Sequence, residues 1–169
     1  MTGGTSPIRA TDDSARAMAA GLLAAARHGA LGVIHPETGW PHVTRIALAM
    51  IDGVPVTLVS DLALHTRALR ADPRAGLLIG EPGPRGDPLV HPRISLTVRA
   101  GFVPRPSAAD EAIRAAWLAG RPKSTVYAGL ADFHFLRLEI LGAALNAGFG
   151  RAYILTPSDL SVARGEGHG

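Results

Sequence analysis

The first long stretch with helical periodicity covers residues 13–28. Met18, Leu22 and Ala26 recur every four residues, behind a short run of side chains whose oxygens can cap a helix. Gly29 follows and offers the left-handed conformation that commonly ends a helix. The pattern therefore predicts an amphipathic helix that ends at residue 28.

A second helical pattern begins at Ser107, which forms a capping-box-like start with Asp110. Its apolar stripe consists of Ile113, Ala116 and Trp117. Gly120 and Pro122 end the pattern. A shorter helix is predicted over residues 64–71, just before the helix-terminating pair Asp72-Pro73.

Elsewhere apolar and polar residues alternate, as in strands with one buried face. The alternation is cleanest over residues 95–103. Residues 42–51 and 54–59 flank Asp52-Gly53, a strong signal for a two-residue hairpin. The remaining predicted strands cover residues 30–35, 75–80, 133–141 and 150–155.

Strands that are joined mostly by hairpins, together with two substantial helices, predict a mainly β protein of the α+β class. The expected architecture is an antiparallel barrel with flanking helices. We expect one domain over residues 11–157, with a flexible N-terminus over residues 1–10 and a flexible tail over residues 158–169. Residues 81–92 are rich in proline and glycine and form the longest predicted loop, a type of segment that often carries function.

The amino-acid composition excludes several classes of function. The chain has 169 residues, 47% of them hydrophobic, which suits one compact domain. It contains no cysteine, so disulfides, thiolate nucleophiles and iron–sulfur clusters are excluded, and a reducing, cytoplasmic location is expected. The net charge of +3 and the absence of a basic tract predict no nucleic-acid partner. No apolar run is long enough to predict a membrane span.

Arg45 is the first candidate for ligand binding. In a strand its side chain shares a face with Ala47 and Ala49, which places a permanent positive charge beside a shallow surface. A flat anionic molecule would fit over such a face. The alternative is an ordinary solvent-exposed arginine on an edge strand.

A second candidate is the turn that begins at Ser60. His65 and Thr66 fall in the first turn of the following predicted helix, where free backbone N–H groups and the helix dipole favour phosphate. Hydroxyl and imidazole groups also bind phosphate. The alternative is that Ser60 and Asp61 only cap the helix.

Four strings then carry a family resemblance: VTRIALAM, HTRALRADPR, GDPLVHPR and GFGRA, in that order. Together they resemble the FMN-binding split-barrel family typified by pyridoxamine 5'-phosphate oxidase, and most closely its haem iron utilisation branch. The resemblance covers roughly residues 15–157. It implies a six-stranded antiparallel Greek-key split barrel, a homodimer with two FMN sites at its interface, and an oxidoreductase activity on a small molecule.

The resemblance also implies roles for individual residues. Arg45 matches the strand arginine that holds the FMN phosphate, and Ser60 matches the hydroxyl residue that closes the next strand. His65 and Thr66 stand where family members place a basic pair on the phosphate. Arg93 falls near a polar residue that reaches the isoalloxazine ring.

Two departures from the family pattern bear on function. His65 and Thr66 replace an arginine and a lysine, and Met50 replaces another lysine, so weaker phosphate binding is expected. No counterpart of the oxidase's C-terminal substrate residues follows Arg151, so pyridoxamine phosphate oxidation is not expected.

The second function left open is that of a haem-binding protein of iron utilisation, which would use the same dimer cleft without a catalytic flavin. His91 and His168 are the loop and tail candidates for an axial haem ligand. None of the seven histidines has the spacing of a zinc pair, so no protein-held metal site is expected. No residue stands out as a catalytic acid or base.

Overall fold

The computed structural model describes residues 8–148 and 150–161. Its strands are β1 (Ile8–Arg9), β2 (His28–Ile34), β3 (Pro41–Ala47), β4 (Ala49–Ile51), β5 (Val54–Ser60), β6 (Arg74–Ile79), β7 (Arg93–Phe102), β8 (Phe133–Asn146) and β9 (Ala152–Leu155). Its helices are α1 (Asp13–Ala25), α2 (Leu64–Ala71), α3 (Ala108–Gly120), α4 (Thr125–Ala128) and α5 (Pro157–Ser161), with single 3-10 turns η1 (Pro88–Val90) and η2 (Pro122–Ser124).

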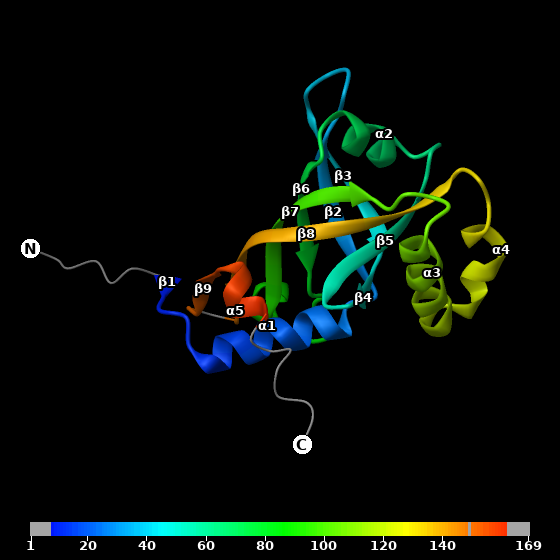
Figure 1. The fold of residues 1–169 in the computed structure, drawn as a ribbon. Helices are drawn as coiled ribbons and strands as arrows, with labels where there is room; N and C mark the ends of the chain where they lie inside the picture. The colour runs from blue at the N-terminus through cyan, green and yellow to red at the C-terminus, as the bar shows by residue number, and fades with distance from the viewer. Residues whose placement is uncertain (1–7, 149, 162–169) are drawn as a thin grey trace, which may run out of the picture.

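The strands form one sheet that wraps into a split barrel. Hydrogen-bonded neighbours follow the order β3-β2-β6-β7-β8-β5-β4. Because β4 directly follows β3 in the chain, the two ends of this series come together. Figure 1 shows α2 across the upper end of the barrel, α1 below it, and α3 and α4 to one side. This confirms the predicted α+β split barrel, with more strands than the six expected.

β8 is the strand at which the sheet divides. One edge of this 14-residue strand pairs with β7, whereas the other edge pairs with β5 over residues 133–137 and with β9 over residues 143–146. Between these two segments β5 and β9 diverge, and β8 passes from one to the other. The predicted strand stopped at residue 141 because the sequence gives no sign that β9 prolongs the pairing.

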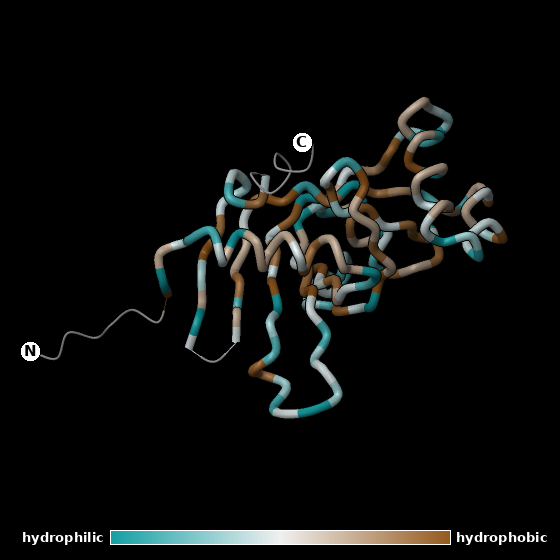
Figure 2. Tube along the Cα trace, turned by 90° about the horizontal axis from the view of Figure 1, so that it is seen from below, coloured by the Kyte–Doolittle hydropathy of each residue, from teal (hydrophilic) through white to brown (hydrophobic). Residues whose placement is uncertain are grey.

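The buried side chains form two cores. The larger fills the barrel and includes inward residues of β2, β6 and β7 together with the buried face of α1. The smaller lies between α3 and the outer side of β5 and β8, around Trp117 and Phe135. Figure 2 shows the hydrophobic stretches gathered in the strands, with the projecting loops mostly hydrophilic. No helix of the described residues is both long and apolar enough to span a bilayer.

Two predicted boundaries differ from the structure for a clear steric reason. α1 ends at Ala25, and His28 opens β2 instead of closing the helix. Gly29 is therefore a strand residue and does not provide a left-handed helix stop. A Cβ at Gly29 would lie 2.9 Å from the side chains of both Leu48 and Leu77, so glycine is needed there for close packing.

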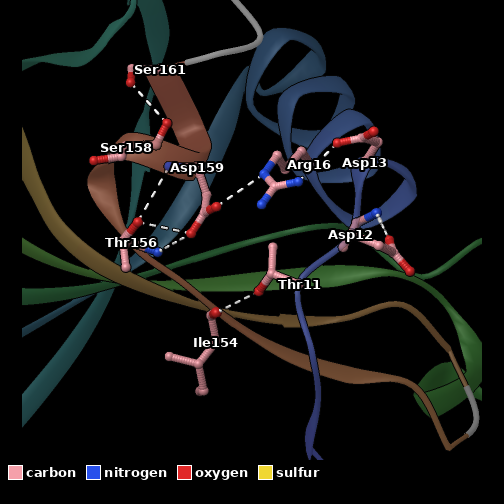
Figure 3. A network of polar contacts seen from close by, with 10 residues as sticks. Thr11, Asp12, Asp13, Arg16, Ile154, Thr156, Ser158, Asp159 and Ser161 are labelled. Carbon is pink, nitrogen blue, oxygen red and sulfur yellow. Dashed lines mark hydrogen bonds and ion pairs between the residues drawn. The ribbon is translucent and has the colours of Figure 1, made fainter.

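β1 lies within the N-terminal segment expected to be flexible and α5 overlaps the start of the expected tail, and contacts with the domain hold both of them. β1 pairs in parallel with β9. Figure 3 shows the second contact, where Arg16 of α1 meets Asp159 of α5 with 3.0 Å between Nε and Oδ1. The backbone N–H and hydroxyl of Thr156 both donate to Asp159 Oδ2 at 2.8 Å. These hydrogen bonds, and to a smaller extent Arg16, lower the pKa of Asp159.

The Asp159 carboxylate, held by Thr156 and to a smaller extent by Arg16, predicts an acid-sensitive part of the stability. A carboxylate with a lowered pKa in the folded state stabilises the fold above its ordinary pKa of 3.8, and this contribution is lost as the pH falls through the lowered value. Asp159→Asn should therefore lower the urea midpoint at pH 7, and its difference from wild type should shrink in acid. Asp13 is the matched control, because it also contacts Arg16 but is fully exposed. Equal destabilisation by Asp13→Asn would contradict the assignment.

Candidate functional site

β2 and β3 present two different faces because side chains alternate along each strand. Leu31, Val33 and Ile46 point into the barrel and are buried. The intervening residues point outward, where Ala30 pairs with Arg45 and His28 pairs with Ala47. The predicted arrangement of Arg45 beside Ala47 is therefore present, on the outer surface of the barrel.

This outer surface continues across neighbouring strands and consists mostly of small and apolar residues. We call it the platform: Ala30, Gly32, Ile34, Val43, Arg45, Ala47, Gly76, Leu78, Ser95 and Thr97. Its apolar members are unusually open to solvent, with Val43 67% exposed and Leu78 41% exposed. Small residues leave room for a planar molecule, and exposed apolar patches of this kind mark binding surfaces.

Arg45 is the charged group of the platform. Its side chain is exposed and forms no hydrogen bond or ion pair with any other residue that the structure describes. Its guanidinium N–H groups are thus available to an external anion. Arginine suits carboxylate or phosphate because its planar fork can bind two oxygens at once.

The other predicted residues gather at the turn from β5 into α2, and their hydroxyls are already in use. Thr66 is fully buried and donates to the backbone carbonyl of Ser60 at 2.6 Å. The Ser60 hydroxyl contacts Asp132 Oδ2 at 3.1 Å and accepts the Leu62 N–H at 3.2 Å. Ser60 does not cap α2, because the helix begins after Ala63, which has no side chain to cap it.

His65 lies half-buried beside the turn and is biased toward its neutral form. Burial lowers the pKa of His65, and the neighbouring His42 on the inward side of β3 lowers it further. An imidazole with a lowered pKa offers little positive charge at neutral pH. This end of α2 is therefore less favourable for phosphate than the predicted constellation suggested.

A polar network that sequence reasoning missed fixes this turn to the barrel. Asp61 accepts from Arg70 of α2 at 2.7 Å and lies 2.8 Å from Nε2 of His134 on β8. Arg70 also stacks over the ring of Phe102, 4.3 Å from its centroid. Arg70 and His134 lower the pKa of Asp61. The contact between Asp61 and His134 joins residues 73 positions apart, so no local sequence pattern predicts it.

Arg93 opens β7, two residues before the predicted strand, and its guanidinium donates to the loop carbonyls of Leu89 at 3.0 Å and His91 at 3.4 Å. His91 likewise holds the loop, with its Nε2 2.9 Å from the carbonyl of Arg85. Both side chains thus shape the 81–92 loop. His168 lies outside the described residues.

Arg27 and Arg121 form a further candidate that the sequence did not suggest. They line one hollow of about 360 Å³ together with Ala49 and Met50, at the end of the β3–β4 strand away from α2. Burial and the charge of Arg27 lower the pKa of Arg121. Neither arginine pairs with a carboxylate in the described ranges. Arg27 donates to the carbonyls of Ala24 and Ala26 at the end of α1, and Arg121 donates to the carbonyls of Arg27 and Leu48.

The structure therefore divides the predicted site into two parts. Arg45 lies on the outward platform, next to the small residues of β2 and β3. Ser60, His65 and Thr66 lie at the α2 end of the barrel, where their polar atoms serve mainly internal contacts. Within one chain, the exposed guanidinium of Arg45 is the strongest anion anchor among the five predicted residues.

Comparisons with known proteins assign the chain to one family. The sequence matches the family described as pyridoxamine 5'-phosphate oxidase over residues 16–145. The chloroplastic non-canonical heme oxygenase HOZ of Arabidopsis thaliana is 31% identical over 117 residues, which cover 69% of this chain and 35% of that protein. This chain thus spans about a third of that curated relative.

Solved structures share the fold over most of the chain. A heme-binding protein from Mycobacterium smegmatis has a TM-score of 0.80 at 28% identity and covers 90% of this chain, which spans 62% of that one. The protein Atu2129 of Agrobacterium tumefaciens, of unknown function, has a TM-score of 0.77 at 30% identity over 89% of this chain and 61% of its own.

The His42–His65 pair generates a prediction about titration. His42→Asn should raise the pKa of His65, because one of the two causes that lower it disappears. The value should remain below the ordinary 6.5, since burial is the larger cause and persists. Imidazole chemical shifts followed by NMR against pH measure this directly. His35→Asn, at the hairpin after β2, serves as the control; an unchanged His65 in His42→Asn would refute the coupling.

Proposed function

Because the chain belongs to the pyridoxamine 5'-phosphate oxidase family, we propose that it forms a homodimer that binds haem against the outward platform. The observation that carries this proposal is the platform itself, an exposed surface of small and apolar residues with an unpaired Arg45. The haem-directed names of the Arabidopsis and Mycobacterium relatives support the choice of ligand.

The residues present fit haem in two respects. The exposed apolar side chains of Val43 and Leu78 and the glycines and alanines between them can cover a flat, mostly apolar ring. Arg45 can pair with a carboxylate at the edge of that ring. When bound, haem supplies an iron centre for redox or oxygen chemistry, while the protein contributes position, charge and shielding from water.

A homodimer follows from the same surface. The platform leaves Ile34, Val43 and Leu78 exposed to solvent, and a second copy would cover the part of this surface that the ligand leaves free. A ligand at the edge of such an interface would contact both subunits. The predicted dimer and the ligand proposal thus depend on one face.

FMN is the second candidate, supported by the start of α2. That helix has no side-chain cap, and an uncapped first turn can bind phosphate through its N–H groups. The fit is weaker, however, because the Thr66 and Ser60 hydroxyls have internal partners and His65 is biased toward neutrality. An FMN-dependent oxidoreductase acting on a small molecule remains a prediction from the family resemblance.

Arg45→Ala tests the anion contact. Loss of one charge-assisted contact should weaken haem binding by about 1.5–3 kcal/mol, or roughly 10- to 100-fold. Titration of the apoprotein with haem, and separately with FMN, gives both affinities and ranks the two ligands. Arg67→Ala is the control, because Arg67 is an exposed arginine on α2. Unchanged haem affinity in Arg45→Ala would remove this residue from the site.

A charged substitution on the platform tests whether this surface forms the dimer interface. Leu78→Glu should shift the protein to monomers in sedimentation equilibrium at micromolar concentration, because a carboxylate would be buried between the two copies. Leu62→Glu is the matched control, since Leu62 is 86% exposed on the β5–α2 turn. A wild-type monomer, or a dimer that tolerates Leu78→Glu, would contradict the proposed interface.

A further inference from the structure

His28 is the one imidazole on the outward surface of β2 and β3. It pairs in register with Ala47, while the adjacent pair on the same face is Ala30 with Arg45. Positions two apart on a strand are separated by about 6.6 Å, and adjacent strands by about 4.8 Å. An imidazole and a guanidinium therefore stand on one surface, separated by alanines, at a spacing that a single flat ligand can span.

The surroundings of His28 resemble those of a metal-binding histidine. Its Nδ1 lies 3.4 Å from a carboxylate oxygen of Glu81, which follows β6. No described residue forms a hydrogen bond or ion pair with its Nε2. Metal-bound histidines commonly present one ring nitrogen to the metal while a carboxylate orients the other. The pair borders a hollow of about 260 Å³ whose lining includes Leu22 and Ile79.

Two other histidines lie outside β2 and β3, and one ring nitrogen of each is engaged there. Nε2 of His91 contacts the carbonyl of Arg85, and a carbonyl only accepts, so this nitrogen carries the proton. Nε2 of His134 lies 2.8 Å from Asp61 in the network that holds α2. The loop histidine proposed from sequence as an axial ligand therefore lies off the outward surface of β2 and β3, with its Nε2 bonded within the 81–92 loop.

The remaining described histidines are placed differently. Nδ1 of His35 accepts two backbone N–H groups of its own hairpin, which puts the proton on its Nε2. His42 and His65 adjoin each other at the α2 end, away from the platform. No three His, Cys, Asp or Glu side chains of the described residues cluster to hold a bare metal ion, whereas a porphyrin brings four nitrogen ligands and needs only one more.

We propose that His28 is the axial ligand of haem iron, bound through Nε2, with Glu81 as the positioning residue at Nδ1. This assignment rests on the proposed function and adds to it the residue that holds the iron. Arg45 then pairs with a propionate of the same haem, and the hollow beside His28 receives an apolar edge of the ring. Glu81, whose carboxylate lies 3.4 Å from Nδ1, would increase the electron donation of the imidazole by accepting the Nδ1 proton when the haem is bound.

The experiment compares wild type, His28→Ala, Glu81→Gln, His91→Ala and His168→Ala after loading with haem. Absorption and resonance Raman spectra of the ferrous form report a histidine ligand through the iron–histidine stretching band. His28→Ala should lose this band and bind haem at least about tenfold more weakly, and added imidazole should restore a nitrogen-ligated spectrum. Glu81→Gln should keep the band but move it to lower frequency, while His91→Ala should match wild type.

The outcomes separate this assignment from the function on which it rests. If wild type binds haem but the band persists in His28→Ala, or disappears only in His168→Ala, the assignment is overturned and haem binding stands. If wild type takes up no haem, the proposed function itself fails. Far-UV circular dichroism verifies folding, and Glu81→Gln provides a second readout because Glu81 is 62% exposed and its replacement leaves His28 in place.

Discussion

The register between β2 and β3 is the constraint on which the functional face depends. It places Leu31, Val33 and Ile46 inside the barrel and leaves Ala30, Arg45 and Ala47 on the outside. A shift of one residue would exchange the two sets, exposing the core and burying a guanidinium. The same pairing that builds the barrel therefore also creates a flat surface with one free positive charge.

Electrostatics distinguishes this surface from the α2 end of the barrel. At α2, Asp61, Arg70 and His134 satisfy one another, and the hydroxyls of Ser60 and Thr66 have partners. Such a network stabilises the turn but leaves few donors for an external ligand. On the platform Arg45 has no competing acceptor, so an incoming carboxylate would not have to displace one.

Local patterns in the sequence were sufficient to predict several helices and turns. Asp52-Gly53 forms the predicted hairpin, with both residues at positive φ, and α2 covers residues 64–71 as expected. Ser107 accepts the N–H of Asp110 at the start of α3. In each case the determining interaction lies within a few residues, which is the range over which sequence patterns are informative.

The features that were not predicted depend on residues far apart in the chain. The local sequence predicts Gly29 as a helix stop. Its role in close packing depends on Leu48 and Leu77, which contact it only in the folded barrel. The contact of Arg16 with Asp159 spans 143 positions and orders a helix in the expected tail. In the candidate site, Arg45 was found from alternation alone, whereas the internal bonding of Thr66 and the carboxylate beside His28 require the assembled sheet.

In the proposed complex the ligand lies on the platform and not at the start of α2. Paramagnetic broadening of backbone amide NMR signals tests this, with ferric haem compared against diamagnetic zinc protoporphyrin as the reference. The account predicts the strongest broadening at Ala30, Ala47 and their neighbours on β2 and β3, with the Ser60–Thr66 turn much less affected. Broadening centred on that turn, with β2 and β3 unchanged, would contradict it.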